Sequence, residues 1–255
     1  MENTTKPFLG DVTGITMSTT DLDRSFEFYS KLGFKELIRS DFPFPLLQIS
    51  DGALLIMLRK DTASYIALTY YVKDLEDKIR SIENMGIEFI IKPLASDMIK
   101  RYVMRSPDGL SISLVTFVEG FSQPQGPTML NTPQGDFFDP SKYVNKTCGM
   151  FGEFAHPVSD LDTSIDFWKK LGFNVLSKME TPYPWAIISD GLAIVGLHQT
   201  KSFDYPVITF FAADMPDKIN KIKESGITDI KEAGQGNVVL TTPENQHINL
   251  FKMGF

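Results

Sequence analysis

Residues 21–34 read DLDRSFEFYSKLGF, and residues 160–173 read DLDTSIDFWKKLGF. The register between these segments continues through a Pro-x-Pro loop and an Ile-Ser-Asp-Gly turn, as far as Leu58 and Leu197. Chance does not keep two stretches aligned over so many positions. The chain is therefore an internal duplication, in which residues 12 to 118 recur as residues 151 to 253.

Each copy contains two smaller units, because a strand, an Asp-Leu or Asp-Met step and an amphipathic helix ending in glycine occur twice in it. Asp21 and Asp74 precede runs of apolar residues at helical spacing and are the expected N-caps, and Gly33 and Gly86 are the expected ends. Short β-branched runs separated by Asp-Gly turns follow each helix and indicate strands. The pattern predicts an α+β fold with four βαβββ units.

Composition narrows the function classes. The chain has 255 residues, of which 42% are hydrophobic and 22% charged, and its net charge of -7 comes without a basic cluster, which argues against nucleic acid as a partner. Cys148 is the single cysteine and cannot form an internal disulfide. No apolar run approaches the roughly 18 residues of a membrane span, and the first ten residues do not read as a signal peptide. We expect a cytoplasmic monomer or homodimer that does not bind membranes.

Proline and glycine accumulate between the two copies, which is typical of a linker. We therefore expect a first domain at residues 1–118, a linker at 119–148 and a second domain at 149–255.

The Asp-Leu-Asp helix ending in Leu-Gly-Phe, together with the later turn Ser106-Pro107-Asp108-Gly109, resembles the vicinal oxygen chelate superfamily of glyoxalases, bleomycin-resistance proteins and extradiol dioxygenases. The resemblance implies two glyoxalase-like domains, in which paired units wrap an incomplete barrel around a concave pocket. Catalytic members hold a divalent metal there with His, Glu or Gln. The fold also hosts plain binding proteins, so architecture does not name a reaction.

The resemblance further implies where metal ligands would stand, on the first and last strands of the units. In the first copy these positions, with the fourth-strand position, are Gly14, Ala67, Ser113 and Met57. In the second copy they are Glu153, Val207, Asn249 and Gly196. One carboxylate and one amide make a poor metal site. We therefore expect no resident metal, with Zn, Ni, Mn or Fe as the alternative cofactor.

Strand alternation adds two histidines near these positions. His247 shares a face with Asn249, and His198 closes its strand near the pocket edge, so both would converge with Glu153. One interpretation is that these are ordinary strand-end residues. The other is a site with Glu153 and His247 as catalytic residues and, if a metal is present, Glu153, His198 and His247 as its ligands. His156 has odd spacing from Glu153 and is expected on the helix-covered face.

An aromatic and proline loop recurs in both copies, as Phe42-Pro43-Phe44-Pro45 and as Tyr183-Pro184-Trp185. Such a loop either stacks on a planar ligand or plugs the open side of the barrel. The ligand-binding candidates are Phe44, Tyr183, Trp185, His198, Asn249, Arg59 and Ser113, and further candidates for pocket lining include Thr69 and Thr209. Phe28 and Phe167 lie on the helix stripes and are expected in the core.

Three hypotheses follow. The first is a protein that binds a small hydrophobic or aromatic molecule without the usual metal. The second is an enzyme with its site in the second domain, either a metal-dependent lyase or ring-cleaving dioxygenase, or a metal-free isomerase or lyase with Glu153 as general base. The third is that the first copy is a scaffold and only the second keeps a pocket.

Overall fold

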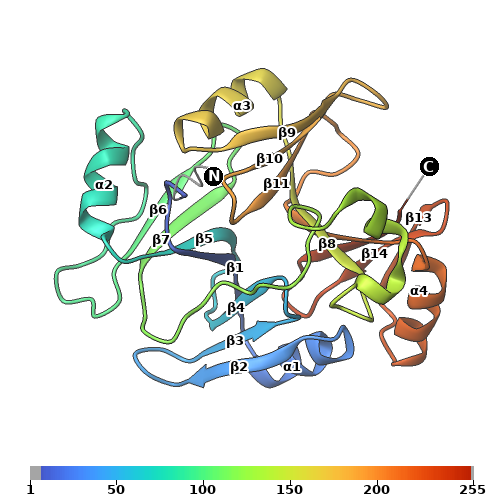
Figure 1. Ribbon diagram of the computed structural model, residues 1–255. Helices are drawn as coiled ribbons and strands as arrows, with labels where there is room; N and C mark the ends of the chain where they lie inside the picture. The colour runs from blue at the N-terminus through green and yellow to red at the C-terminus, as the bar shows by residue number, and fades with distance from the viewer. Residues whose placement is uncertain (1–6, 254–255) are drawn as a thin grey trace. The chain divides into compact units, whose positions relative to one another are not determined.

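The computed structural model describes residues 7–253 and has an α+β fold, as the sequence predicts (Figure 1). The helices are α1 (Leu22–Lys31), α2 (Leu75–Asn84), α3 (Leu161–Lys170) and α4 (Met215–Glu224). The strands of the first copy are β1 (Val12–Thr19), β2 (Lys35–Ser40), β3 (Leu46–Ser50), β4 (Leu55–Lys60), β5 (Ile66–Val72), β6 (Arg101–Arg105) and β7 (Ser111–Thr116). Those of the second are β8 (Met150–Pro157), β9 (Asn174–Met179), β10 (Trp185–Ser189), β11 (Ile194–His198), β12 (Val207–Ala212), β13 (Ile230–Gly234), β14 (Asn237–Thr241) and β15 (His247–Lys252).

The described strands belong to two mixed sheets, one of seven and one of eight strands. Of the four repeated units, the second differs from the expected βαβββ pattern. Where its counterpart forms β13, it has only an isolated bridge between Ile91 and Val103. Pro93 in this stretch has no N–H to donate to a strand ladder, which interrupts regular pairing. None of the helices in residues 7–253 is long and apolar enough to cross a membrane.

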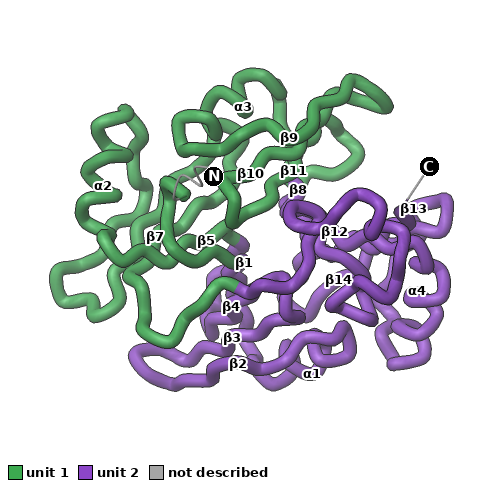
Figure 2. Tube along the Cα trace, in the orientation of Figure 1, with its two compact units in different colours: residues 1–14, 67–123, 156–205 green, residues 15–66, 124–155, 206–255 purple. Residues whose placement is uncertain are grey.

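The chain forms two compact units that cut across the two copies of the sequence (Figure 2). Of the described residues, unit 1 contains 7–14, 67–123 and 156–205, and unit 2 contains 15–66, 124–155 and 206–253. Unit 1 therefore contains α2 and α3, and unit 2 contains α1 and α4. The domain limits drawn from the sequence remain a prediction.

Unit 2 contains two sets of neighbouring strands. One has the order β2-β3-β4-β1, with β1 parallel to β4, and the other has the order β13-β14-β15-β12-β8, with β12 parallel to β15. Phe34 and Phe210 meet edge to face in the core of this unit, with ring centroids 6.4 Å apart. The helices and strands of unit 2 thus share one aromatic core.

Unit 1 repeats this arrangement with fewer strands. Its neighbours are β5-β7-β6, with β5 parallel to β7, and β11-β10-β9, which are antiparallel. Trp168 on α3 is its largest fully buried side chain and packs edge to face against Phe173 at 4.6 Å.

Side-chain caps begin two of the helices. Asp21 accepts hydrogen bonds from the backbone N–H groups of Asp23 and Arg24, at 3.1 and 3.0 Å, and Asp160 accepts one from Thr163 N–H at 2.7 Å. The cap expected at Asp74 was wrong in this respect. Asp74 precedes α2 with φ -101° and ψ 56°, away from the extended conformation of Asp21, and its side chain makes no capping bond.

Two carboxylates in equivalent turns fasten helices from the other copy. Asp108 accepts hydrogen bonds from Ser159 N–H at 2.7 Å and from the Ser164 hydroxyl, at the start of α3 in unit 1. In unit 2, Glu244 accepts hydrogen bonds from the hydroxyls of Ser25 and Tyr29 on α1. Burial, followed by the Glu244 carboxylate, raises the pKa of the Tyr29 phenol well above its usual value. The turn of one copy therefore holds the helix of the other.

The segment 124–148 is ordered and is anchored in unit 2. It contains the 3-10 helices η1 (Gln134–Phe138) and η2 (Pro140–Lys142). Asn145 donates hydrogen bonds from Nδ2 to Leu32 C=O at 3.1 Å and to the Asp51 carboxylate at 3.0 Å. The buried Lys218 ammonium donates a hydrogen bond to Lys146 C=O at 2.6 Å. The predicted linker is thus a fixed part of unit 2 over this range.

Candidate functional site

A row of buried polar residues crosses three neighbouring strands of unit 2. Thr209 on β12 is in register with Glu153 on β8 and with Asn249 on β15, and the three are exposed by 0%, 5% and 8%. The Asn249 amide donates a hydrogen bond from Nδ2 to Thr209 Oγ1 at 3.3 Å. The sheet thus brings Glu153 and Asn249 to the same row, separated by Thr209.

His247 lies beside this row. It is in register with Val207, two positions before Asn249 on β15, and is half-buried. Successive even positions share a face of a strand, so His247 faces the same side as Asn249. Glu153, His247 and Asn249 therefore belong to one part of unit 2, whereas His198 belongs to unit 1.

The equivalent row of the first copy lies in unit 1 and carries only hydroxyls. Thr69 on β5 is in register with Ser113 on β7, and both are almost fully buried. Neither hydroxyl has a hydrogen-bond partner among the residues that the structure describes. Buried hydroxyls are normally paired, so this pair retains bonding capacity for a small polar group.

Aromatic side chains surround His198 at the end of β11 in unit 1. Trp185 pairs with His198 in register, and its indole stacks near-parallel to the imidazole, at 6.4 Å between centroids and 19° between planes. The Tyr183 hydroxyl lies 3.3 Å from His198 Nδ1, and the Phe203 ring meets the imidazole edge-on at 5.7 Å. We call Tyr183, Trp185, His198 and Phe203 the His198 cluster. All four side chains are half-buried, so part of each remains accessible.

The first copy has a different arrangement at the same positions, in unit 2. Arg59 stands where His198 does, and its Cζ lies 4.0 Å from the centre of the Phe44 ring. In this cation–π contact the guanidinium covers a face of Phe44 that would otherwise be open to a ligand. The Arg59 Nε is buried and has no hydrogen-bond partner within residues 7–253.

The residues at the inherited metal positions do not fit a divalent metal. Of Gly14, Ala67, Ser113 and Met57 in the first copy, none carries a carboxylate, imidazole or thiolate. In the second copy, Glu153 is the sole strong ligand beside Val207, Asn249 and Gly196. Across residues 7–253, no three His, Cys, Asp or Glu side chains gather as metal ligands. This set of donors therefore does not favour a resident divalent metal.

His156 lies in the interior of unit 1, and its expected place on the helix-covered face of the sheet stays a prediction. It is buried, and its Nε2 lies 3.2 Å from Asp108 C=O. Burial lowers the pKa of its imidazole. The residue is part of the unit 1 interior.

Sequence reasoning missed several residues of these sites. Phe203, and Tyr205 behind it at 6.1 Å, come from the irregular segment after β11. Their signal was two aromatic residues in alternate positions within a polar stretch. Thr69 and Thr209 were expected in the pocket lining, but their central place in each row depends on strand register, which no local pattern specifies.

Comparison with known proteins gives a fold and no closer relative. No family model matches the chain, and no curated protein sequence matches it. Among solved structures, the chain is similar to the 2,3-dioxygenase LapB from Pseudomonas sp. KL28, with a TM-score of 0.59, 12% identity, and coverage of 97% of this chain and 94% of that one.

Two other similar structures are homoprotocatechuate 2,3-dioxygenases. The Brevibacterium fuscum enzyme, in complex with 3,4-dihydroxyphenylacetate, has a TM-score of 0.60 and 15% identity, with coverage of 97% of this chain and 83% of that one. The Arthrobacter globiformis enzyme has a TM-score of 0.60 and 13% identity, with coverage of 98% and 81%. At these identities the likeness establishes the fold of extradiol dioxygenases and nothing about activity.

Proposed function

We propose that the protein binds a small planar aromatic molecule, and that it does so without the divalent metal typical of this fold. The observation that carries the proposal is the His198 cluster. A ring that stacks on Trp185 gains apolar contact area and a favourable quadrupole arrangement, worth about 0.5–1.5 kcal/mol beyond area burial. The Tyr183 hydroxyl and the His198 imidazole offer polar atoms that orient a hydroxyl or carboxylate on such a ring.

The cluster is already arranged for a ligand. The Trp185 indole Nε1 donates a hydrogen bond to Thr181 C=O at 3.3 Å, which holds the ring in place. Because this bond holds the Trp185 ring before binding, little side-chain entropy of Trp185 is lost when a ligand binds. Preorganised rings with accessible faces are typical of a binding surface.

The experiment is a titration with catechol, phenol and 3,4-dihydroxyphenylacetate, followed by calorimetry and by tryptophan fluorescence. The chain has two tryptophans, and Trp168 is buried in the core, so quenching by a stacked ligand reports on Trp185. We expect saturable binding of at least one probe. Trp185→Leu is expected to weaken it about tenfold, which corresponds to about 1.4 kcal/mol.

Phe44→Leu is the matched control, because it alters the equivalent loop in the first copy. It is expected to leave the affinity unchanged. The proposal is wrong if no aromatic probe binds saturably, or if Trp185→Leu binds as tightly as the wild type.

The second candidate is a metal-dependent lyase or ring-cleaving dioxygenase that uses Glu153. It is favoured by the dioxygenase activity of the similar structures and by the row that joins Glu153 to Asn249. Elemental analysis of the purified protein separates the two candidates. Stoichiometric Zn, Ni, Mn or Fe that disappears in Glu153→Ala would sink the metal-free proposal.

A further inference from the structure

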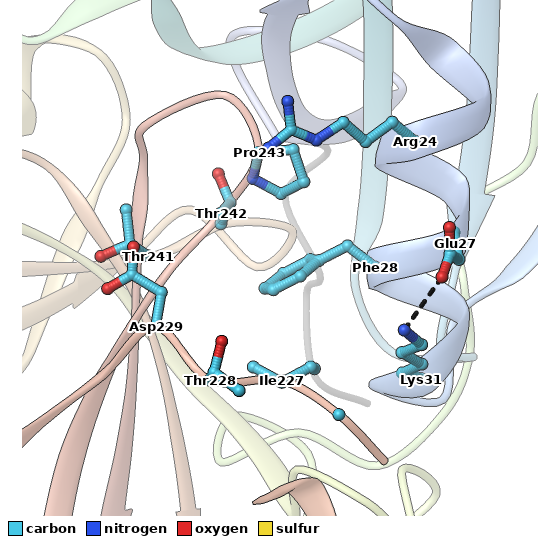
Figure 3. A pocket seen from close by; sticks show the side chains of 11 residues that line it. Arg24, Glu27, Phe28, Lys31, Ile227, Thr228, Asp229, Thr241, Thr242 and Pro243 are labelled. Atoms are coloured by element: carbon cyan, nitrogen blue, oxygen red, sulfur yellow. Dashed lines mark hydrogen bonds and ion pairs between the residues drawn. The ribbon is translucent and has the colours of Figure 1, made fainter.

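A groove of about 270 Å³ lies beside α1 in unit 2, and none of its lining residues belongs to the rows or to the His198 cluster described above (Figure 3). One wall is α1, and the other comes from two segments of the second copy. The lining residues are Arg24, Glu27, Phe28, Lys31, Gly226, Ile227, Thr228, Asp229, Thr241, Thr242 and Pro243. This volume is slightly below the range of pockets that hold drug-sized ligands, so the groove suits a smaller molecule, of the size of a metabolite.

Phe28 forms an apolar surface in the middle of this groove. The sequence predicted it as a core residue, but the side chain is only half-buried. Its ring packs edge-on against Tyr29, with centroids 5.3 Å apart, and points across the groove toward Ile227 and Thr228 (Figure 3). One face of an aromatic ring is therefore available to an apolar group.

Two opposite charges without partners stand on opposite walls. Lys31 and Glu27 form an ion pair at 3.0 Å and satisfy each other. Arg24 on α1 and Asp229 on the opposite wall are both exposed, and neither side chain makes a hydrogen bond or ion pair with another described residue (Figure 3). The wall that bears Asp229 is fixed by the bond from Thr241 N–H to Asp229 C=O, at 3.1 Å.

Neither charge belongs to the repeated framework. The counterpart of Arg24 in the second copy is Thr163, and the counterpart of Asp229 in the first copy is Phe89. Phe28, in contrast, has an aromatic counterpart in Phe167. The scaffold thus accounts for the ring but not for the pair of charges that flanks it.

We propose that this groove binds a zwitterionic α-amino acid with an apolar side chain. Its carboxylate pairs with the Arg24 guanidinium, which matches carboxylate geometry with two parallel N–H donors. Arg24 lies in the first turn of α1, where the helix also favours negative charge. The ammonium group pairs with Asp229, and the apolar side chain lies on Phe28. The proposal does not depend on the ligand of the His198 cluster.

The test uses three probes that share a phenyl body and differ in charge: L-phenylalanine, 3-phenylpropionate and 2-phenylethylamine. Calorimetry on the full chain is expected to show that L-phenylalanine binds at least about tenfold more tightly than either singly charged probe. Arg24→Gln is expected to weaken L-phenylalanine and 3-phenylpropionate and to leave 2-phenylethylamine unchanged. Asp229→Asn is expected to weaken L-phenylalanine and 2-phenylethylamine and to leave 3-phenylpropionate unchanged.

Arg80→Gln on α2 and Asp166→Asn on α3 are matched controls, because each removes the same kind of charge from an exposed helix face. Both are expected to bind all three probes as the wild type does. The proposal is overturned if L-phenylalanine does not bind, if the three probes bind equally, or if Arg24→Gln and Asp229→Asn leave its affinity unchanged. It is also overturned if Trp185→Leu abolishes L-phenylalanine binding, since the amino acid then occupies the His198 cluster.

Discussion

The Ser-Asp-Gly turns at Asp51 and Asp190 have the same backbone hydrogen bonds, but the second oxygen of each Asp carboxylate accepts from a different donor. In both, Oδ1 accepts two backbone N–H groups two and three positions further on. The other oxygen of Asp190 accepts a hydrogen bond from the Tyr70 hydroxyl at 2.7 Å, whereas that of Asp51 accepts one from the Asn145 amide at 3.0 Å. Phe210 stands where Tyr70 does in the repeat, and it has no hydroxyl to give.

The carboxylates that hold the helices, Glu244 and Asp108, also have different hydrogen-bond donors in the two copies. Tyr29 on α1 donates a hydrogen bond from its hydroxyl to Glu244. Trp168 stands at the equivalent position of α3, and the shorter Asp108 accepts hydrogen bonds from Ser159, just before that helix, and from Ser164 in it. The duplication therefore keeps a carboxylate at each of these positions, and the hydrogen-bond donors to it differ between the two copies. Three predictions test this difference.

The largest effect is expected from the segment 124–148. Asn145→Ala removes two donated bonds and two that its Oδ1 accepts from Thr147 and Cys148 N–H. It also leaves the buried Asp51 carboxylate without that donor, so we expect the free energy of unfolding to fall by about 3 kcal/mol. Tyr70→Phe removes one bond to Asp190 and is expected to cost about 1.5 kcal/mol. Urea unfolding measures both, and a larger loss for Tyr70→Phe would contradict the comparison.

A smaller difference is expected between the turn carboxylates. Glu244 is buried and is bonded to two hydroxyls, whereas Asp108 is partly exposed. Glu244→Gln is expected to lower the free energy of unfolding by about 2 kcal/mol. The carboxylate accepts one hydroxyl with each oxygen, whereas an amide has one oxygen that accepts and an NH₂ group that only donates. Asp108→Asn is expected to cost less than about 1 kcal/mol, since water replaces part of what is lost. Equal losses of stability for the two variants in thermal or urea unfolding would show that burial does not determine how much each carboxylate contributes.

The smallest effect concerns pH. Burial raises the pKa of the Asp190 carboxyl, while the backbone N–H groups and the Tyr70 hydroxyl lower it in part. The folded protein therefore holds this proton more tightly than the unfolded chain. The associated stability is present below the ordinary Asp pKa of about 3.9 and is lost as the pH rises through the folded-state pKa.

Asp190→Asn is expected to remove that dependence. Its free energy of unfolding should fall less than that of the wild type between about pH 4 and pH 7. The difference between the two proteins should be smaller than the losses expected for Asn145→Ala and Glu244→Gln. Parallel profiles for the two proteins would show that Asp190 does not titrate differently on folding. Asp51, whose pKa burial also raises, serves as the equivalent site in the other unit.

Much of the framework was predictable because it depends on local signals. Capping at Asp21, the positive φ of +89° at Gly33 and the strand runs follow from short stretches of sequence. The missing strand before β6 was not predicted, because the interruption at Pro93 was given no weight against the repeat pattern. The uncapped start at Asp74 was not predicted either, since it depends on a backbone conformation that an Asp residue does not specify. The core positions expected for Phe28 and Phe167 were wrong, since both side chains are half-buried. An apolar position on a helix stripe does not show what covers it.

The sites were less predictable because they depend on contacts between distant residues. Trp185 and His198 were expected near a pocket, and the structure adds their stacking and the Phe203 contact. Glu244 lies 219 residues from its partner Ser25, and no local pattern announces such a pair. The convergence of Glu153 with His198 stays a prediction.

The reactivity of Cys148 provides a measure of how often the 124–148 segment opens. The thiol is fully buried beside Leu32 C=O, and burial strongly raises its pKa, so a reactive thiolate does not form in the closed state. Since no other cysteine competes, the rate of alkylation in native buffer counts how often this stretch lifts from its anchors. That rate would report the free energy of opening at a single place, without unfolding the rest of the protein.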